Sequence, residues 1–85
     1  MTKLDKLKQR LLSRPKDFTF EELVSLLSKI GYEEIKLGKT AGSRKAFYHP
    51  ENQHIIRLHK PHPKNILKMY IIDMVIKELQ KVNGL

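Results

Sequence analysis

The sequence predicts an α+β domain in which helices cover a three-stranded antiparallel sheet. Apolar residues recur at helical spacing near both ends of the chain, and three short extended segments separated by turn residues lie between them. A meander of three strands forms a single sheet with one face to bury, and the two longer helices are its natural cover. The 85 residues leave room for one modest core.

Two helices are expected before the sheet. The first spans Leu4–Ser13, where leucines recur at helical spacing, and Pro15 ends it because proline disfavours helical backbone in the residue before it. Thr19 and Glu22 match a capping box, in which each side chain accepts a hydrogen bond from a free backbone N–H group. This pattern predicts a second helix that stops at Gly31.

Three strands follow the second helix. They are expected at Tyr32–Leu37, Arg44–His49 and His54–His59. Pro50 begins the turn between the last two, because proline suits the first central position of a tight turn. In the third strand, alternation lets Ile56 and Leu58 face the core and places Arg57 and His59 on the opposite face.

A long helix completes the domain. Its apolar stripe predicts a start at Lys64 or Asn65 and an end near Gly84. Lys64 and Lys68 would then lie one turn apart near its start, where they could grip successive phosphates. Solvated lysines are the common alternative on such a helix.

The chain is strongly basic. Its 17 lysines and arginines against nine acidic residues give a formal charge of +8, which attracts polyanions through counterion release and steering. RNA, DNA, an acidic protein and anionic lipid all carry the required charge. The alternative is a basic surface kept for solubility, although acidic residues serve solubility better.

Cysteine usage and the start of the chain point to the cytoplasm. The chain has no cysteine, so neither a disulfide framework nor a thiolate zinc site is available. Charges interleaved through the first six residues leave no apolar stretch for a signal peptide or a membrane span. We therefore expect a cytoplasmic protein with no membrane partner.

The connection Lys39–Lys45 combines backbone freedom, hydroxyls and cations, which suits phosphate oxygens. It lacks the spacing of a Walker loop and does not lead from a strand into a helix, so nucleotide binding by that route is not expected. The alternative is an ordinary hairpin loop.

The segment His59–Pro63 carries the most suggestive chemistry. It would hold the imidazoles of His59 and His62 beside Lys60, and an imidazole can act as acid or base at cellular pH. RNA cleavage needs a base for the ribose 2′-hydroxyl and cations for the charge that develops on the phosphate, which Lys60, Arg57 and Arg44 could supply. The alternative is that the histidines cap or orient the turn.

Metal or cofactor binding is not expected. The four histidines at 49, 54, 59 and 62 are possible nitrogen ligands, but no cysteine exists and no acidic residue lies near the last pair.

Several short features together resemble the HicA toxins. They are a capped helix that ends in Gly31-Tyr32, a loop with Gly42-Ser43, an aromatic residue three positions after Arg44, namely Phe47, and a turn rich in histidine and proline before the last helix. The resemblance covers about Thr19 to Leu85. It leaves residues 1–15 as an added N-terminal helical extension to a domain over residues 16–85.

The resemblance implies a fold similar to the double-stranded RNA-binding domain, with helix, three strands and helix. It also implies an RNA-cleaving toxin, acting on messenger RNA, that a HicB antitoxin holds inactive. In the family's pattern the Gly-Ser pair is followed by the catalytic histidine, and here Arg44 stands in its place. Arginine cannot exchange a proton near neutral pH, so it can only bind or stabilise a phosphate.

Three hypotheses follow: a metal-independent endoribonuclease toxin, a non-catalytic RNA-binding module, and an adaptor whose basic face docks an acidic partner. The expected catalytic residues are His59 and His62. The expected RNA-binding residues are Lys39, Gly42, Ser43, Arg44, Lys45, Arg57, Lys60, Lys64 and Lys68.

Overall fold

The architecture was obtained as a computed structural model, which describes residues 2–38, 42–61, 64–82 and 84–85. Along the chain the elements are α1 (Lys3–Leu12), α2 (Phe20–Lys29), β1 (Glu33–Ile35), β2 (Arg44–His49), β3 (His54–His59) and α3 (Met69–Lys81). The strands form one antiparallel sheet in the order β1-β2-β3. The predicted α+β class and element order are confirmed.

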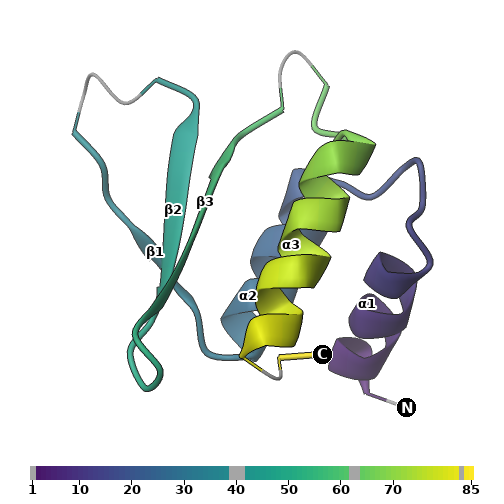
Figure 1. The fold of residues 1–85 in the computed structure, drawn as a ribbon. Helices are drawn as coiled ribbons and strands as arrows, with labels where there is room; N and C mark the ends of the chain where they lie inside the picture. Colours follow the sequence, from purple (N-terminus) through teal and green to yellow (C-terminus); the bar gives the residue numbers. More distant parts are fainter. Residues whose placement is uncertain (1, 39–41, 62–63, 83) are drawn as a thin grey trace.

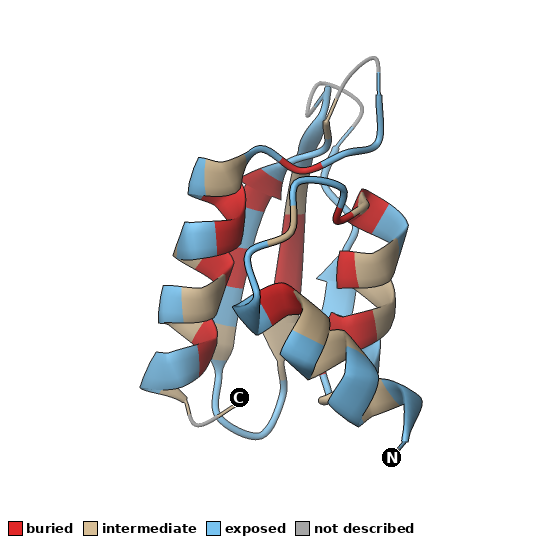
Figure 2. Cartoon of the chain, turned by 90° about the vertical axis from the view of Figure 1, so that its right-hand side faces the viewer, coloured by how far each residue is buried: buried red, intermediate tan, exposed pale blue. Residues whose placement is uncertain are grey.

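The molecule has three layers (Figure 1). Helices α2 and α3 cover one face of the sheet, and α1 lies on the side of this helix pair that faces away from the sheet. Buried residues of the helices face inward (Figure 2), and the core contains apolar side chains from all three helices and from β2 and β3. The start of α1 and the C-terminus both lie at the end of the molecule opposite to the β3–α3 connection.

The predicted start and end of α2 are confirmed. The Thr19 hydroxyl accepts a hydrogen bond from the backbone N–H of Glu22 at 3.1 Å, and the Glu22 carboxylate accepts one from the backbone N–H of Thr19 at 3.1 Å. Gly31 follows the helix with φ +106°, a conformation that favours glycine. A Cβ atom at Gly31 would also lie 2.7 Å from His49 Nε2, so a side chain has no room there.

The expected start of the last helix was wrong. Helix α3 begins at Met69, because the preceding segment pairs with the chain before α2 instead. The Leu67 N–H donates to the Phe18 carbonyl at 2.8 Å, and the carbonyl of Asn65 accepts from the Phe20 N–H at 2.7 Å. This extended pairing buries Leu67 and satisfies backbone groups that a helix would have bonded internally, so tertiary context overrides the helical pattern.

Strand β1 is shorter than the predicted Tyr32–Leu37. It covers Glu33–Ile35 at the edge of the sheet, and Ile35 and Leu37 remain 37% and 43% exposed. Leu37 lies beyond the residues that pair with β2. Ile35 and Leu37 therefore add to an open surface, whereas Tyr32, just before the strand, is buried in the core.

Helix α1 is fixed to the rest of the molecule by burial and ion pairs. Leu11 is fully buried in the core cluster. Arg10 bonds the carboxylate of Glu22 at 2.6 Å, a contact that lowers the pKa of Glu22, and also reaches Asp17 at 3.0 Å. Just after the helix, Arg14 pairs with Asp73 of α3 at 2.7 Å.

A polar relay joins the sheet to α3. The Tyr32 hydroxyl lies 2.6 Å from Nδ1 of His54, whose Nε2 lies 3.0 Å from the carboxylate of Glu78. Burial and the negative charge of Glu78 raise the pKa of Tyr32. The hydrogen bond from His54, with a smaller effect of Lys81, lowers the pKa of Glu78. The relay thus satisfies polar groups that pack against the core.

The relay predicts an acid-sensitive contribution to stability. Because the folded protein lowers the pKa of Glu78, its contribution is present above the unfolded value of about 4.3 and is lost as pH falls through the folded value. In Glu78→Gln the free energy of unfolding, measured by urea denaturation from pH 7 to pH 3, should therefore fall less than in the wild type. Glu51→Gln removes an exposed carboxylate outside the relay and should keep the wild-type pH dependence. Parallel curves for Glu78→Gln and wild type would contradict the role of the relay.

Candidate functional site

His59 is the last residue of β3 and is held by the loop that precedes β2. Its Nδ1 lies 3.3 Å from the Ser43 hydroxyl, and the backbone N–H of Lys60 donates to the Ser43 carbonyl at 2.7 Å. The second bond continues the pairing of β2 and β3 beyond the ends of the strands. His59 is exposed, yet its position is set by the backbone of two strands.

The contact with Ser43 leaves the other imidazole nitrogen of His59 without a partner among the described residues. A hydroxyl can donate and accept a hydrogen bond, so Ser43 can bond Nδ1 whether or not that nitrogen carries a proton. Nε2 can then offer either a lone pair or a proton to a bound molecule. The geometry suits an acid or a base.

Two arginines lie on the same sheet face as His59. Arg44 is directly opposite His59 in the antiparallel register, which places their Cβ atoms about 5 Å apart. Arg57 precedes His59 by two residues, so its side chain leaves the strand on the same face. This confirms the predicted alternation in β3, where Ile56 and Leu58 are buried.

A hollow lies beside these residues, on the open sheet face, which is the face that α2 and α3 leave uncovered (Figure 1). The hollow has a volume of about 430 Å³, and Leu37, Gly38, Arg44, Lys45, Ala46, Arg57, Leu58 and His59 line it. We call it the sheet hollow. No carboxylate lines it, so its electrostatic character is cationic.

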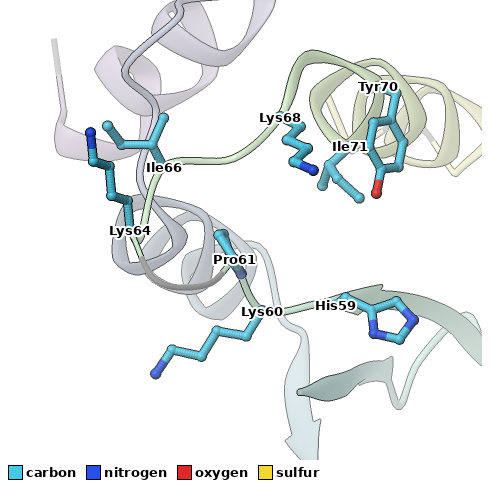
Figure 3. Close-up of a pocket in the computed structure, with 8 residues that line it drawn as sticks. All are labelled: His59, Lys60, Pro61, Lys64, Ile66, Lys68, Tyr70 and Ile71. Atoms are coloured by element: carbon cyan, nitrogen blue, oxygen red, sulfur yellow. The ribbon is translucent and has the colours of Figure 1, made fainter. Parts of the chain in front are cut away.

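A second hollow, of about 490 Å³, lies between the end of β3 and the start of α3. We call it the helix hollow. Its lining residues, shown in Figure 3, are His59, Lys60, Pro61, Lys64, Ile66, Lys68, Tyr70 and Ile71. His59 is shared by the two hollows, and no carboxylate lines this one either.

The structure separates the predicted binding residues into two groups. Arg44, Lys45 and Arg57 line the sheet hollow, whereas Lys60, Lys64 and Lys68 line the helix hollow. Each group shares its hollow with the imidazole of His59.

Two of these lysines have contacts of their own in the folded chain. The Lys45 ammonium lies 3.5 Å from the carboxylate of Glu34, and the Lys60 ammonium lies 5.7 Å from the centre of the Phe20 ring. An incoming phosphate would therefore compete with Glu34 for Lys45. Gly42 is exposed with φ +63°, and open space surrounds the position that a Cβ atom would take.

The expected helical spacing of Lys64 and Lys68 was wrong. Lys64 and Lys68 are not one turn apart on a helix, because both precede α3 and flank the residues that pair with the chain around Thr19. Lys68 is the N-cap residue and has extended backbone. Lys39 and His62 fall outside the described residues.

Sequence reasoning missed Tyr70 and Ile66. Both line the helix hollow, and they are 65% and 42% exposed. A signal for Tyr70 existed, since it precedes two buried isoleucines, Ile71 and Ile72, and lies off the apolar stripe of its helix. An aromatic residue outside the apolar stripe should face solvent.

Neither a metal cluster nor a membrane span was found in the described part of the chain. Within it, no group of three or more histidine or acidic side chains is placed to hold a metal ion. The described helices are too short or too polar to cross a bilayer.

The chain was compared with protein families, curated proteins and solved structures. No curated protein and no solved structure matches it. Residues 20–80, from the start of α2 almost to the end of α3, match the family described as "HicA toxin of bacterial toxin-antitoxin". This match spans well over half of the chain and covers every described residue that lines the two hollows. The chain therefore belongs to the HicA toxin family and is a toxin of a toxin–antitoxin system.

Proposed function

We propose that this toxin is an endoribonuclease that cleaves messenger RNA in the cytoplasm without a metal ion. The observation that carries the proposal is the placement of His59, which is oriented through Nδ1 by Ser43 and faces Arg44 across the strand pair. An imidazole with one oriented nitrogen and adjacent guanidinium groups is the combination that phosphate ester cleavage by the 2′-hydroxyl needs.

In the proposed reaction Nε2 of His59 takes the proton of a ribose 2′-hydroxyl. The 2′-oxygen then forms a bond to the adjacent phosphorus, and the bond from phosphorus to the 5′-oxygen of the next nucleotide breaks. The leaving oxygen takes up a proton, either from the imidazolium of His59 or from a second acid. Arg44 and Arg57 stabilise the negative charge on the phosphate oxygens.

Arg44 keeps a role in binding but none in proton transfer. It occupies the position that follows Gly42-Ser43, where the family pattern has a histidine, and a guanidinium stays protonated. Proton transfer is thereby assigned to His59 on the neighbouring strand. This assignment makes the pair of strands β2 and β3, and not one loop, the proposed catalytic unit.

We further propose that a HicB-type antitoxin neutralises the toxin by covering the open sheet face. Three apolar residues near the arginines of the sheet hollow are each at least 36% exposed. They are Ile35 on β1, Leu37 just after β1, and Ile55 on β3. A protein partner could bury these apolar side chains and pair the two cations with carboxylates. Access of RNA to His59 would then be blocked on that side.

The test combines induction with cleavage by purified protein. Inducing the wild-type gene alone should stop growth, and the purified toxin should cut a labelled messenger RNA in the presence of excess chelator. A 2′-O-methyl copy of the same RNA lacks the attacking hydroxyl and should stay intact. Salt-sensitive binding of RNA without any product would instead identify a non-catalytic RNA-binding module. Cleavage that the chelator stops would contradict the metal-free reaction.

A further inference from the structure

We infer that the helix hollow is a subsite for one unstacked nucleotide of a single-stranded RNA, with Tyr70 as the platform on which the base stacks. The inference rests on the proposed function in one respect only, since it takes RNA as the ligand. It assigns a role to a residue outside the proposed chemistry and selects one class of RNA.

The first argument is the exposure of Tyr70. Its side chain is 65% exposed, more than any other exposed large apolar residue of the described chain. The next two residues, Ile71 and Ile72, face the core, so the turn of α3 needs no packing from Tyr70. Among the described residues its hydroxyl has no hydrogen-bond partner. An aromatic ring held in solvent on a rigid helix is suited to stack on a base.

The second argument is what surrounds the ring. Lys60, Lys64 and Lys68 line the same hollow, and no acidic residue does. In Figure 3 the ammonium of Lys68 and the hydroxyl of Tyr70 point toward the space between α3 and β3, whereas the ammonium groups of Lys60 and Lys64 point away from it. Lys68 is thus placed to meet a phosphate while a base lies on Tyr70. Cations with an aromatic platform are the shared features of single-strand binding sites.

The third argument is the position of His59. It lies on the side of the hollow opposite to Tyr70 and Lys68 (Figure 3). His59 also lines the sheet hollow, together with the two arginines. A nucleotide whose base stacks on Tyr70 would direct its sugar and phosphate toward the imidazole. The helix hollow therefore orients the strand, and the sheet hollow receives the next phosphate.

The geometry excludes a duplex from this subsite. Its volume of about 490 Å³ is that of a small-molecule site, which holds one nucleotide. In an A-form duplex both faces of each internal base are already stacked, and proteins recognise such helices through shape and backbone. A base can lie on Tyr70 only in a loop, a bulge or a single strand. This specificity is opposite to that of a double-stranded RNA-binding domain, the fold that the resemblance to HicA toxins led us to expect from the sequence.

The test measures affinity for RNA that cannot be cut. A fluorescent 2′-O-methyl 12-mer, single-stranded or annealed to its complement, is titrated with the wild type, Tyr70→Phe and Tyr70→Ala. Single-strand affinity should fall about 5- to 150-fold in Tyr70→Ala and stay within about twofold in Tyr70→Phe, which keeps the ring. Duplex affinity should be the same for all three proteins. Thermal melting of Tyr70→Ala close to wild type would show that the fold is intact, as expected for an exposed residue.

The salt dependence separates stacking from charge. Tyr70→Ala should lower affinity by the same factor at every salt concentration, whereas Lys68→Ala should reduce the slope of log affinity against log salt by about 0.7. If Tyr70→Ala binds single-stranded RNA as tightly as the wild type, the inference is overturned. The same conclusion holds if the substitution weakens binding of the antitoxin but not of RNA. Binding is measured here without cleavage. The nucleotide subsite can therefore be confirmed even if the proposed ribonuclease activity is contradicted, and the activity can be confirmed even if the subsite is contradicted.

Discussion

Replacing His59 by alanine is expected to slow RNA cleavage about 100- to 10,000-fold and to abolish toxicity. The reason is that the substitution removes the only described imidazole that lines either hollow, and a general acid or base contributes a factor of that size. His59 is exposed, so its loss creates no cavity in the core. Initial rates of cleavage of a labelled RNA, with growth after induction, measure the effect.

His59→Asn is the matched control for orientation. An asparagine side chain can keep a hydrogen bond to Ser43 but cannot exchange a proton, so it should be as inactive as the alanine variant. Both variants should bind the uncut 2′-O-methyl RNA within a few-fold of the wild type. Cleavage retained by either variant would remove His59 from the chemistry and shift attention to His62.

Replacing Leu11 by alanine is expected to lower the free energy of unfolding by about 2–5 kcal/mol. Leu11 of α1 is fully buried among side chains of α2 and α3, so its removal leaves a cavity that the layered core cannot close. A domain of this size has a total stability of only about 5–15 kcal/mol, so the variant should approach the limit of folding. Urea denaturation should show a lower midpoint with an unchanged slope.

The adjacent Leu12 supplies the control. It is 47% exposed on the same helix, so Leu12→Ala makes the same chemical change without a cavity. Its free energy of unfolding should stay within about 0.5 kcal/mol of the wild type. Equal losses in the two variants would mean that the effect comes from helix propensity, and that α1 is not an integral part of the core.

The patterns that depend on neighbouring residues were predictable from the sequence. The capping box at Thr19, the bounds of β2 and β3 and the inward direction of Ile56 all follow from local spacing. The start of α3 did not, because the segment around Leu67 forms a bridge to residues near Phe18, almost 50 positions earlier in the chain. Contacts between residues so far apart in the chain do not affect the local spacing of apolar residues from which the helix was predicted.

The sequence named many of the residues that line the two hollows, but it missed Tyr70 and Ile66 and did not show how the residues divide between the hollows. Sequence alternation put Arg57 and His59 on one face, and the cross-strand partner Arg44 needed the register of two strands. The grouping of Lys64 and Lys68 with Tyr70 follows from the extended segment, which the helical pattern concealed. For that reason the sequence did not show that these residues line two hollows that share an imidazole.

The placement of both chain ends has a practical consequence for work with this protein. The start of α1 and the C-terminus lie at the end of the molecule opposite to the β3–α3 connection. An affinity handle, a fluorophore or a surface linker at either end would therefore project away from His59 and from both hollows. Single-molecule and immobilised formats, in which one end of the chain is held while RNA or antitoxin is supplied from solution, suit this architecture.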